Sequence, residues 1–233
     1  MIPQWLHQLG DIIEGALPKI LAGRTDVVEK PDGSLVTAGD LYVESLVEEA
    51  MAEHLPDAIL LSEERILPAQ RLDDGLFVIV DPIDGTENFA AGLKEWGTGI
   101  SVWDHGTHLG SMLLMPELSE RLVTGDGIPK LHSRITGLSS TIDDNVREAL
   151  EADGEFRIIG CAVYNLYNVV RGAYTRFLNP RGAYVWDLLP GIMLAAEHGC
   201  DIEINGEAFN GGYLDPARRH RVDIRHRYDL HPG

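Results

Sequence analysis

The sequence predicts an α+β fold, and three patterns support this. Residues 4–21 place apolar side chains at helical spacing, which is typical of an amphipathic helix. Short, wholly apolar runs such as residues 76–80 are typical of buried strands. In the second half of the chain, strand-like and helix-like segments alternate, which indicates helices packed on a sheet.

Length and composition set the scale of the fold. The chain has 233 residues, of which 44% are apolar and 24% charged, as in globular proteins with a substantial core. We expect residues 1–233 to form a single domain. Its N-terminal α+β lobe would span about residues 1–125, and its C-terminal α/β lobe about residues 126–233.

Charge and cysteine usage limit the partners and the compartment. A net charge of −18 disfavours nucleic acids and anionic membranes as the main partners. Cys161 and Cys200 form neither a disulfide framework nor a metal-ligand spacing, so a reducing compartment is expected. Neither a signal peptide nor a membrane span is evident, and we expect a cytoplasmic protein.

The N-terminal part of the sequence predicts two helices, a polar loop and a short strand. Within residues 4–21, Pro18 ends or bends the helix. Residues 30–34 form a polar loop, which either connects two elements or covers a site. Thr37 then begins a second helix with Asp40 three residues later, which is the spacing of a capping box. A short apolar strand, residues 58–62, follows and ends in two acids.

The strand predicted at residues 76–80 is the most informative element of the sequence, because Asp81 follows it directly. Asp84 follows three residues later, beyond a proline that stiffens the chain. This spacing can point both carboxylates at one spot, where a divalent cation would relieve their repulsion. Oxygen ligands favour Mg²⁺, Ca²⁺ or Mn²⁺ over zinc.

Gly85 and Thr86 then open a helix, and free N–H groups at a helix start can bind phosphate. A metal site and an anion site this close together suggest phosphate-ester chemistry. From these residues alone the alternative is an ordinary turn, since Asp, Pro and Gly all favour turns.

The remaining elements complete the two halves. Residues 97–103 and 107–115 predict a hairpin, and residues 121–124 a further strand. The second half is then predicted to contain a helix at residues 143–152, a strand at 156–159, a helix at 161–171, and a helix that Asp187 caps and that runs to residue 198. The basic residues 218–227 predict an edge strand or tail; the alternative is a contact for an anionic substrate or a partner.

Residues 81–89, Asp-Pro-Ile-Asp-Gly-Thr-Glu-Asn-Phe, resemble the first signature of the inositol monophosphatase family, which are Mg²⁺-dependent, lithium-sensitive phosphatases. Residues 35–40 resemble the Val-Thr-x-x-Asp segment of this family, and Glu63 stands in its Gly-Glu-Glu segment. Residues 157–162 are similar to Arg-x-x-Gly-Ser-Ala, and residues 186–191 to the second signature, Trp-Asp-x-x-x-Gly. The resemblance implies a layered αβαβα sandwich.

The resemblance also implies the parts of a catalytic site. Two or three Mg²⁺ ions per site are expected, and Mn²⁺ can substitute. The implied metal ligands are Asp40, Glu63, Asp81, the backbone carbonyl of Ile83, Asp84 and Asp187. The implied catalytic residues are Thr86, paired with Asp40 to orient or deprotonate the attacking water, and Glu63. Gly85 and Thr86 would bind the phosphate through their N–H groups, and Cys161 and Arg181 would contact the substrate.

The implied enzyme is a phosphoric monoester hydrolase that acts on a small phosphorylated metabolite, such as an inositol-1-phosphate-like sugar phosphate, and that works as a homodimer. Inositol-specific members carry a glutamate where this chain has Pro180, and residues 125–130 replace a longer family hairpin. The substrate therefore stays open among inositol phosphate, 3′(2′),5′-bisphosphate nucleotides, fructose 1,6-bisphosphate and histidinol phosphate. A regulatory binding protein on the same fold is the non-enzyme alternative.

Overall fold

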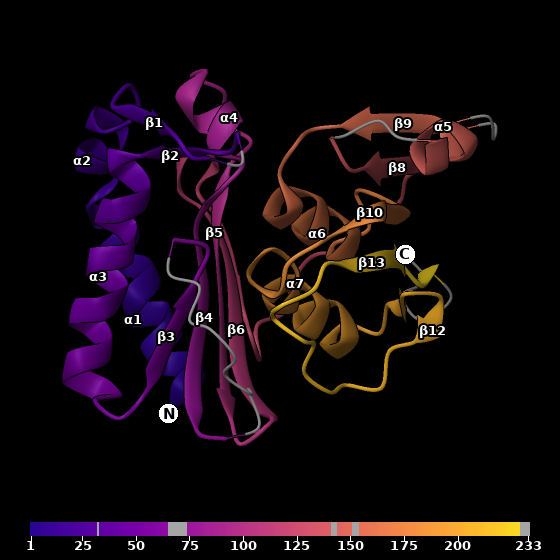
Figure 1. Cartoon of the computed structure of the whole chain (residues 1–233). Coiled ribbons are helices and arrows are strands. Elements are labelled where there is room, and N and C mark those ends of the chain that lie inside the picture. The colour runs from indigo at the N-terminus through magenta and orange to yellow at the C-terminus, as the bar shows by residue number, and fades with distance from the viewer. Residues whose placement is uncertain (32, 65–73, 141–143, 151–153, 229–233) are drawn as a thin grey trace.

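Helices and sheets alternate in the computed structural model, which describes residues 1–31, 33–64, 74–140, 144–150 and 154–228. The order of layers is helix, sheet, helix, sheet, helix (Figure 1). The outermost layer on the C-terminal side is the short helix α5 (Asp144–Leu150), which packs on strand β10 (Arg176–Ala183). The predicted α+β fold in layers is confirmed.

The first sheet is built from the N-terminal half. Its strand order is β3 (Ile59–Ser62), β4 (Leu76–Asp84), β5 (Gly97–Asp104), β6 (Thr107–Met115) and β7 (Glu120–Val123). Strands β3 and β4 are parallel, whereas the others pair antiparallel, and β5 and β6 form the predicted hairpin. Two helices, α1 (Ile2–Gly15) and α3 (Ala38–His54), cover one face, and their apolar side chains form one core with those of the sheet (Figure 1).

The helix predicted over residues 4–21 is two helices in the structure. Helix α1 ends at Gly15, and α2 (Leu17–Ala22) begins with Pro18 in its first turn. Proline has no amide proton to donate to the preceding turn, so the chain restarts a helix there. The loop at residues 30–34 joins two short strands that the sequence did not predict, β1 (Val27–Glu29) and β2 (Leu35–Thr37).

The second sheet comes from the C-terminal half. Its strand order is β12 (Glu207–Ala208), β11 (Asp201–Ile204), β13 (His220–Arg225), β10, β8 (Ile135–Leu138) and β9 (Glu155–Ile158). Two helices, α6 (Ala162–Val170) and α7 (Val185–Glu197), lie between the two sheets (Figure 1). The apolar face of α7 packs on the first sheet, where Trp186 and Leu189 meet Phe77 and Trp103.

The preferred interpretation of the basic segment 218–227 is wrong. Strand β13 lies inside the second sheet, paired on both sides, and is neither an edge strand nor a tail. Its side chains alternate, so that Val222 and Ile224 are buried while Arg221 and Arg225, which flank them, face outward. Asp223 neutralises part of this charge through an ion pair with Arg225, at 2.8 Å. The interpretation relied on the basic composition of this segment and overlooked the alternation of apolar and polar residues that is typical of a strand.

None of the helices in the described part of the chain is both long enough and apolar enough to cross a lipid bilayer.

Candidate metal centre and adjoining cavities

Three acidic side chains from distant parts of the sequence meet at one end of the first sheet. Strands β3 and β4 are parallel neighbours with Ser62 opposite Val80, so the next residues, Glu63 and Asp81, emerge side by side. Asp187 comes from the first turn of α7, which packs on β4. One carboxylate oxygen from each of Glu63, Asp81 and Asp187 lies within 4.8 Å of the other two.

Asp81 is the most strongly desolvated of the three. Its side chain is 1% exposed, and neither carboxylate oxygen has a hydrogen-bond donor among the described residues. Burial, and then the charges of Glu63 and Asp84, raise its pKa well above the usual range. Burial also raises the pKa of Asp187 to about 7. A buried carboxylate without a donor is costly, and oxygen ligands at this spacing fit a hard divalent cation, which would remove that cost.

Asp187 does not cap its helix as predicted. The N-cap of α7 is Tyr184, and Asp187 lies three residues later, where its carboxylate accepts a hydrogen bond from the Tyr184 amide at 2.7 Å. This is the acidic half of a capping box. The helix start thus fixes the position of one carboxylate of the metal group.

Asp84 lies on the same strand as Asp81, β4, but its carboxylate contacts different groups. Strand β4 continues through the signature to Asp84, with a register shift against β5 between Asp81 and Asp84. One oxygen of Asp84 accepts hydrogen bonds from the Val163 amide and, at 3.1 Å, from the Cys161 thiol. Burial raises the pKa of Asp84 to about 6, against these hydrogen bonds. Asp84 therefore lies outside the group of three carboxylates and anchors the start of α6.

Cys161 connects this helix start to Asp84. Its sulfur accepts a hydrogen bond from the Tyr164 amide at 3.3 Å, which makes Cys161 the N-cap of α6, and its thiol donates to Asp84. Serine forms both kinds of hydrogen bond, whereas alanine forms neither.

We expect Cys161→Ala to lower the free energy of unfolding by about 1 kcal/mol, because a helix cap and a donor to a buried carboxylate are lost. Cys161→Ser should stay within about 0.5 kcal/mol of the wild type. Urea unfolding followed by circular dichroism measures both, with Cys200→Ala as the control for loss of a thiol. Equal stability of the alanine and serine variants would contradict the capping role.

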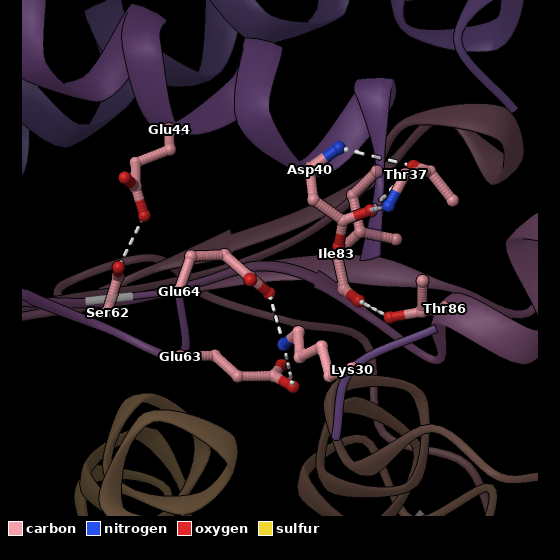
Figure 2. Close-up of polar contacts among 9 residues, drawn as sticks. All are labelled: Lys30, Thr37, Asp40, Glu44, Ser62, Glu63, Glu64, Ile83 and Thr86. Atoms are coloured by element: carbon pink, nitrogen blue, oxygen red, sulfur yellow. Dashed lines mark hydrogen bonds and ion pairs between the residues drawn. The ribbon is translucent and has the colours of Figure 1, made fainter. Parts of the chain in front are cut away.

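Asp40 and Thr86 lie near each other, but the hydrogen bonds of their side chains are made with other residues (Figure 2). Asp40 accepts hydrogen bonds from the Thr37 amide at 2.8 Å and the Thr37 hydroxyl at 2.6 Å, which confirms the predicted capping box. Its other oxygen is buried, with no partner in the described ranges. The Thr86 hydroxyl donates to the carbonyl of Ile83 at 3.0 Å, where the sequence predicted a pairing with Asp40.

Lys30 is a residue of this site that the sequence reasoning missed. It stands at the end of β1, and its amino group lies 2.7 Å from a carboxylate oxygen of Glu64 and 3.2 Å from one of Glu63 (Figure 2). A single lysine in a polar loop gives no signal until the fold brings that loop over the two glutamates. The contact places a positive charge at the edge of the carboxylate group.

Two adjoining cavities open at these residues. The larger, about 610 Å³, is lined by the three carboxylates together with Gly85 and Thr86. The smaller, about 160 Å³, is lined by the two residues expected to contact substrate, Cys161 and Arg181. Asp84, Asp187 and Arg219 line both cavities. Arg219 could not be singled out from the sequence among the basic residues near the C-terminus.

Comparison with known proteins supports the family resemblance of the sequence. The model of the inositol monophosphatase family matches residues 3–128. A Thermotoga maritima protein named fructose-1,6-bisphosphatase/inositol-1-monophosphatase is 27% identical over 207 residues, which cover 79% of this chain and 78% of that protein. The 3′-phosphoadenosine 5′-phosphate phosphatase of Mycobacterium leprae is 25% identical over 229 residues, covering 88% of this chain and 83% of that one.

The fold is also that of a solved structure. The crystal structure of an IMPase/NADP phosphatase complexed with Mg²⁺ and phosphate has a TM-score of 0.77 at 19% identity, covering 97% of this chain and 89% of that chain. At this identity the similarity concerns the fold.

Proposed function

The chain belongs to the inositol monophosphatase family, and from this premise we propose that it is a Mg²⁺-dependent phosphomonoesterase acting on a small phosphorylated metabolite. One observation carries the proposal. The buried carboxylate of Asp81, which has no hydrogen-bond donor in the described structure, lies beside Glu63 and Asp187 in a cavity large enough for a small ester. Such a site suits a divalent cation and a substrate that binds to it.

The side chains of Glu63, Asp81 and Asp187 would hold Mg²⁺, with Asp84, Asp40 and the Ile83 carbonyl as the further ligands that the family signature suggests. Two or three ions per site, with Mn²⁺ as a substitute, are part of this proposal. When bound, the metal supplies Lewis-acid activation of water and neutralises phosphate charge.

The remaining groups of the site bind and orient. Gly85 and Thr86 line the larger cavity at the start of α4 (Thr86–Ala90), and we assign their N–H groups to phosphate oxygens. The Thr86 hydroxyl donates its proton to Ile83, so its oxygen can accept a hydrogen bond from the attacking water. Asp40 has a positioning role, because it holds the turn into α3. In this scheme Glu63 also contacts the attacking water.

A panel of phosphate esters tests this function. We expect phosphate release with Mg²⁺ or Mn²⁺, loss of release with EDTA, and inhibition by Li⁺. The panel contains inositol 1-phosphate, fructose 1,6-bisphosphate, 3′-phosphoadenosine 5′-phosphate and histidinol phosphate, assayed by released phosphate. Absence of turnover on every ester with either metal would overturn the proposal and favour a regulatory binding protein on the same fold.

Further parts of the proposal follow from family membership. We assign the chain one catalytic domain with two lobes, and its support is that the first sheet uses residues 59–123 and the second residues 135–225. Lithium sensitivity, a cytoplasmic location and a homodimer complete it, and light scattering after size exclusion tests the dimer.

A further inference from the structure

The arrangement of the two cavities indicates how a substrate would be oriented in the site. Asp187, one of the three grouped carboxylates, lines both of them, so an ester whose phosphate lies at the carboxylates has its other end toward the smaller cavity. Arg181 and Arg219 both line that smaller cavity. Once a cation compensates the carboxylates, these two arginines are the charged groups that a substrate's alcohol portion meets there.

Arg219 is held in a defined place by the turn that places Asp187. Its guanidinium lies over the ring of Tyr184, 4.7 Å from the ring centroid, and one of its nitrogens donates to the Gly182 carbonyl at 3.2 Å. Tyr184 is the N-cap of α7, and its amide donates to Asp187. The position of Arg219 relative to the metal group is therefore set by one helix start, which makes the guanidinium pre-organised for a ligand.

Neither arginine forms a close ion pair with a carboxylate among the residues that the structure describes, although the charge of Arg219 lowers the pKa of Asp187 against the effect of burial. Other arginines of the C-terminal half do: Arg218 lies 3.2 Å from Asp215, and Arg176 lies 2.6 Å from Asp223. The chain contains 37 acidic residues against 19 basic ones, so an arginine could readily have been paired. Two guanidinium groups without a close ion pair at one cavity favour an anionic occupant with oxygens for bidentate hydrogen bonds, such as a phosphate.

We propose that Arg219, acting with Arg181, is a specificity-determining residue that selects esters whose alcohol portion carries a second phosphate. The inference rests on the proposed phosphatase function and narrows its substrate class to bisphosphorylated sugars or nucleosides. The second phosphate accepts hydrogen bonds from the two guanidinium groups, while the first is hydrolysed at the carboxylates.

Matched substrate pairs test this assignment. The pairs are fructose 1,6-bisphosphate with fructose 1-phosphate, and 3′-phosphoadenosine 5′-phosphate with adenosine 3′-phosphate. The wild type should prefer the bisphosphate of at least one pair by about tenfold or more in kcat/KM, the effect of a charge-assisted hydrogen bond. Arg219→Gln should remove that preference, because it should raise KM for the bisphosphate about tenfold more than KM for the monophosphate. Arg219→Lys should keep part of it, because the charge stays and the planar fork is lost.

Arg218→Gln is the matched control, since Arg218 is adjacent in sequence but lines neither cavity. It should leave both members of each pair unchanged. A wild type that hydrolyses mono- and bisphosphates equally, or an Arg219→Gln variant that weakens both equally, would overturn the inference and leave the phosphatase function standing. If no ester is hydrolysed, the proposed function fails. Calorimetric binding of the same pairs then decides, with about tenfold weaker bisphosphate binding to Arg219→Gln in support and equal binding against.

Discussion

Asp81→Asn is expected to lower Mg²⁺-dependent phosphate release at least about a hundredfold, as loss of a group that stabilises transition-state charge does. The same substitution should stabilise the metal-free protein. The Asp81 carboxylate is 1% exposed, has no donor among the described residues, and lies within reach of Glu63 and Asp187. An amide of the same shape removes the negative charge, so the free energy of unfolding should rise by more than about 1 kcal/mol at neutral pH.

The opposite signs of these two effects separate a metal ligand from a structural residue. Turnover is measured with Mg²⁺, and stability by urea unfolding in EDTA. Asp104→Asn is the control, because Asp104 lies at the hairpin end, exposed and paired with His105 at 2.7 Å, and should change neither quantity. Wild-type turnover in Asp81→Asn would show that the carboxylate holds no catalytic metal. A joint loss of turnover and stability would assign it a role in folding.

Asp81 and Asp84 could be found from local sequence, because they follow an apolar strand, whereas Glu63, Asp187 and Asp40 were assigned to the site through the family resemblance. Asp81 comes after an apolar strand, and Asp40 completes a capping box, which the structure confirms. Residues 81–84, for which an ordinary turn was the alternative interpretation, continue β4 with a register shift, and the chain turns at Gly85. Pairing with β5 decides this, and local turn propensity does not include a partner strand that begins only at Gly97.

The direction of side chains and the cations of the site could not be predicted in the same way. Whether Asp84 faces Asp81 or the start of α6 depends on where α6 lies, and this is a contact between residues far apart in the chain. Lys30 and Arg219 each sit in segments whose composition indicates only a polar loop or a basic tail. Tertiary packing gives them their neighbours, Glu64 and Tyr184.

Without metal, the protein is expected to lose stability as the pH rises from about 4 to about 7. Burial raises the pKa of Asp187 to about 7 and the pKa values of Asp84 and Asp40 to about 6, all from a usual value near 3.8. The folded chain therefore keeps protons that the unfolded chain has released across this pH range. Unfolding releases those protons, so the free energy of unfolding falls as pH rises across this range.

Mg²⁺ should reverse this trend, because it binds the deprotonated carboxylates. We expect a small Mg²⁺-induced rise in Tm near pH 5 and a large one near pH 7.5, where the metal-free protein should be less stable by at least about 2 kcal/mol. Thermal and urea unfolding with EDTA or excess Mg²⁺ at both pH values measure this. Asp187→Asn should flatten the metal-free slope between about pH 6 and 7, whereas Asp104→Asn should leave it unchanged. Metal-free stability that increases toward neutral pH would mean that these carboxylates are compensated within the fold and do not await a cation.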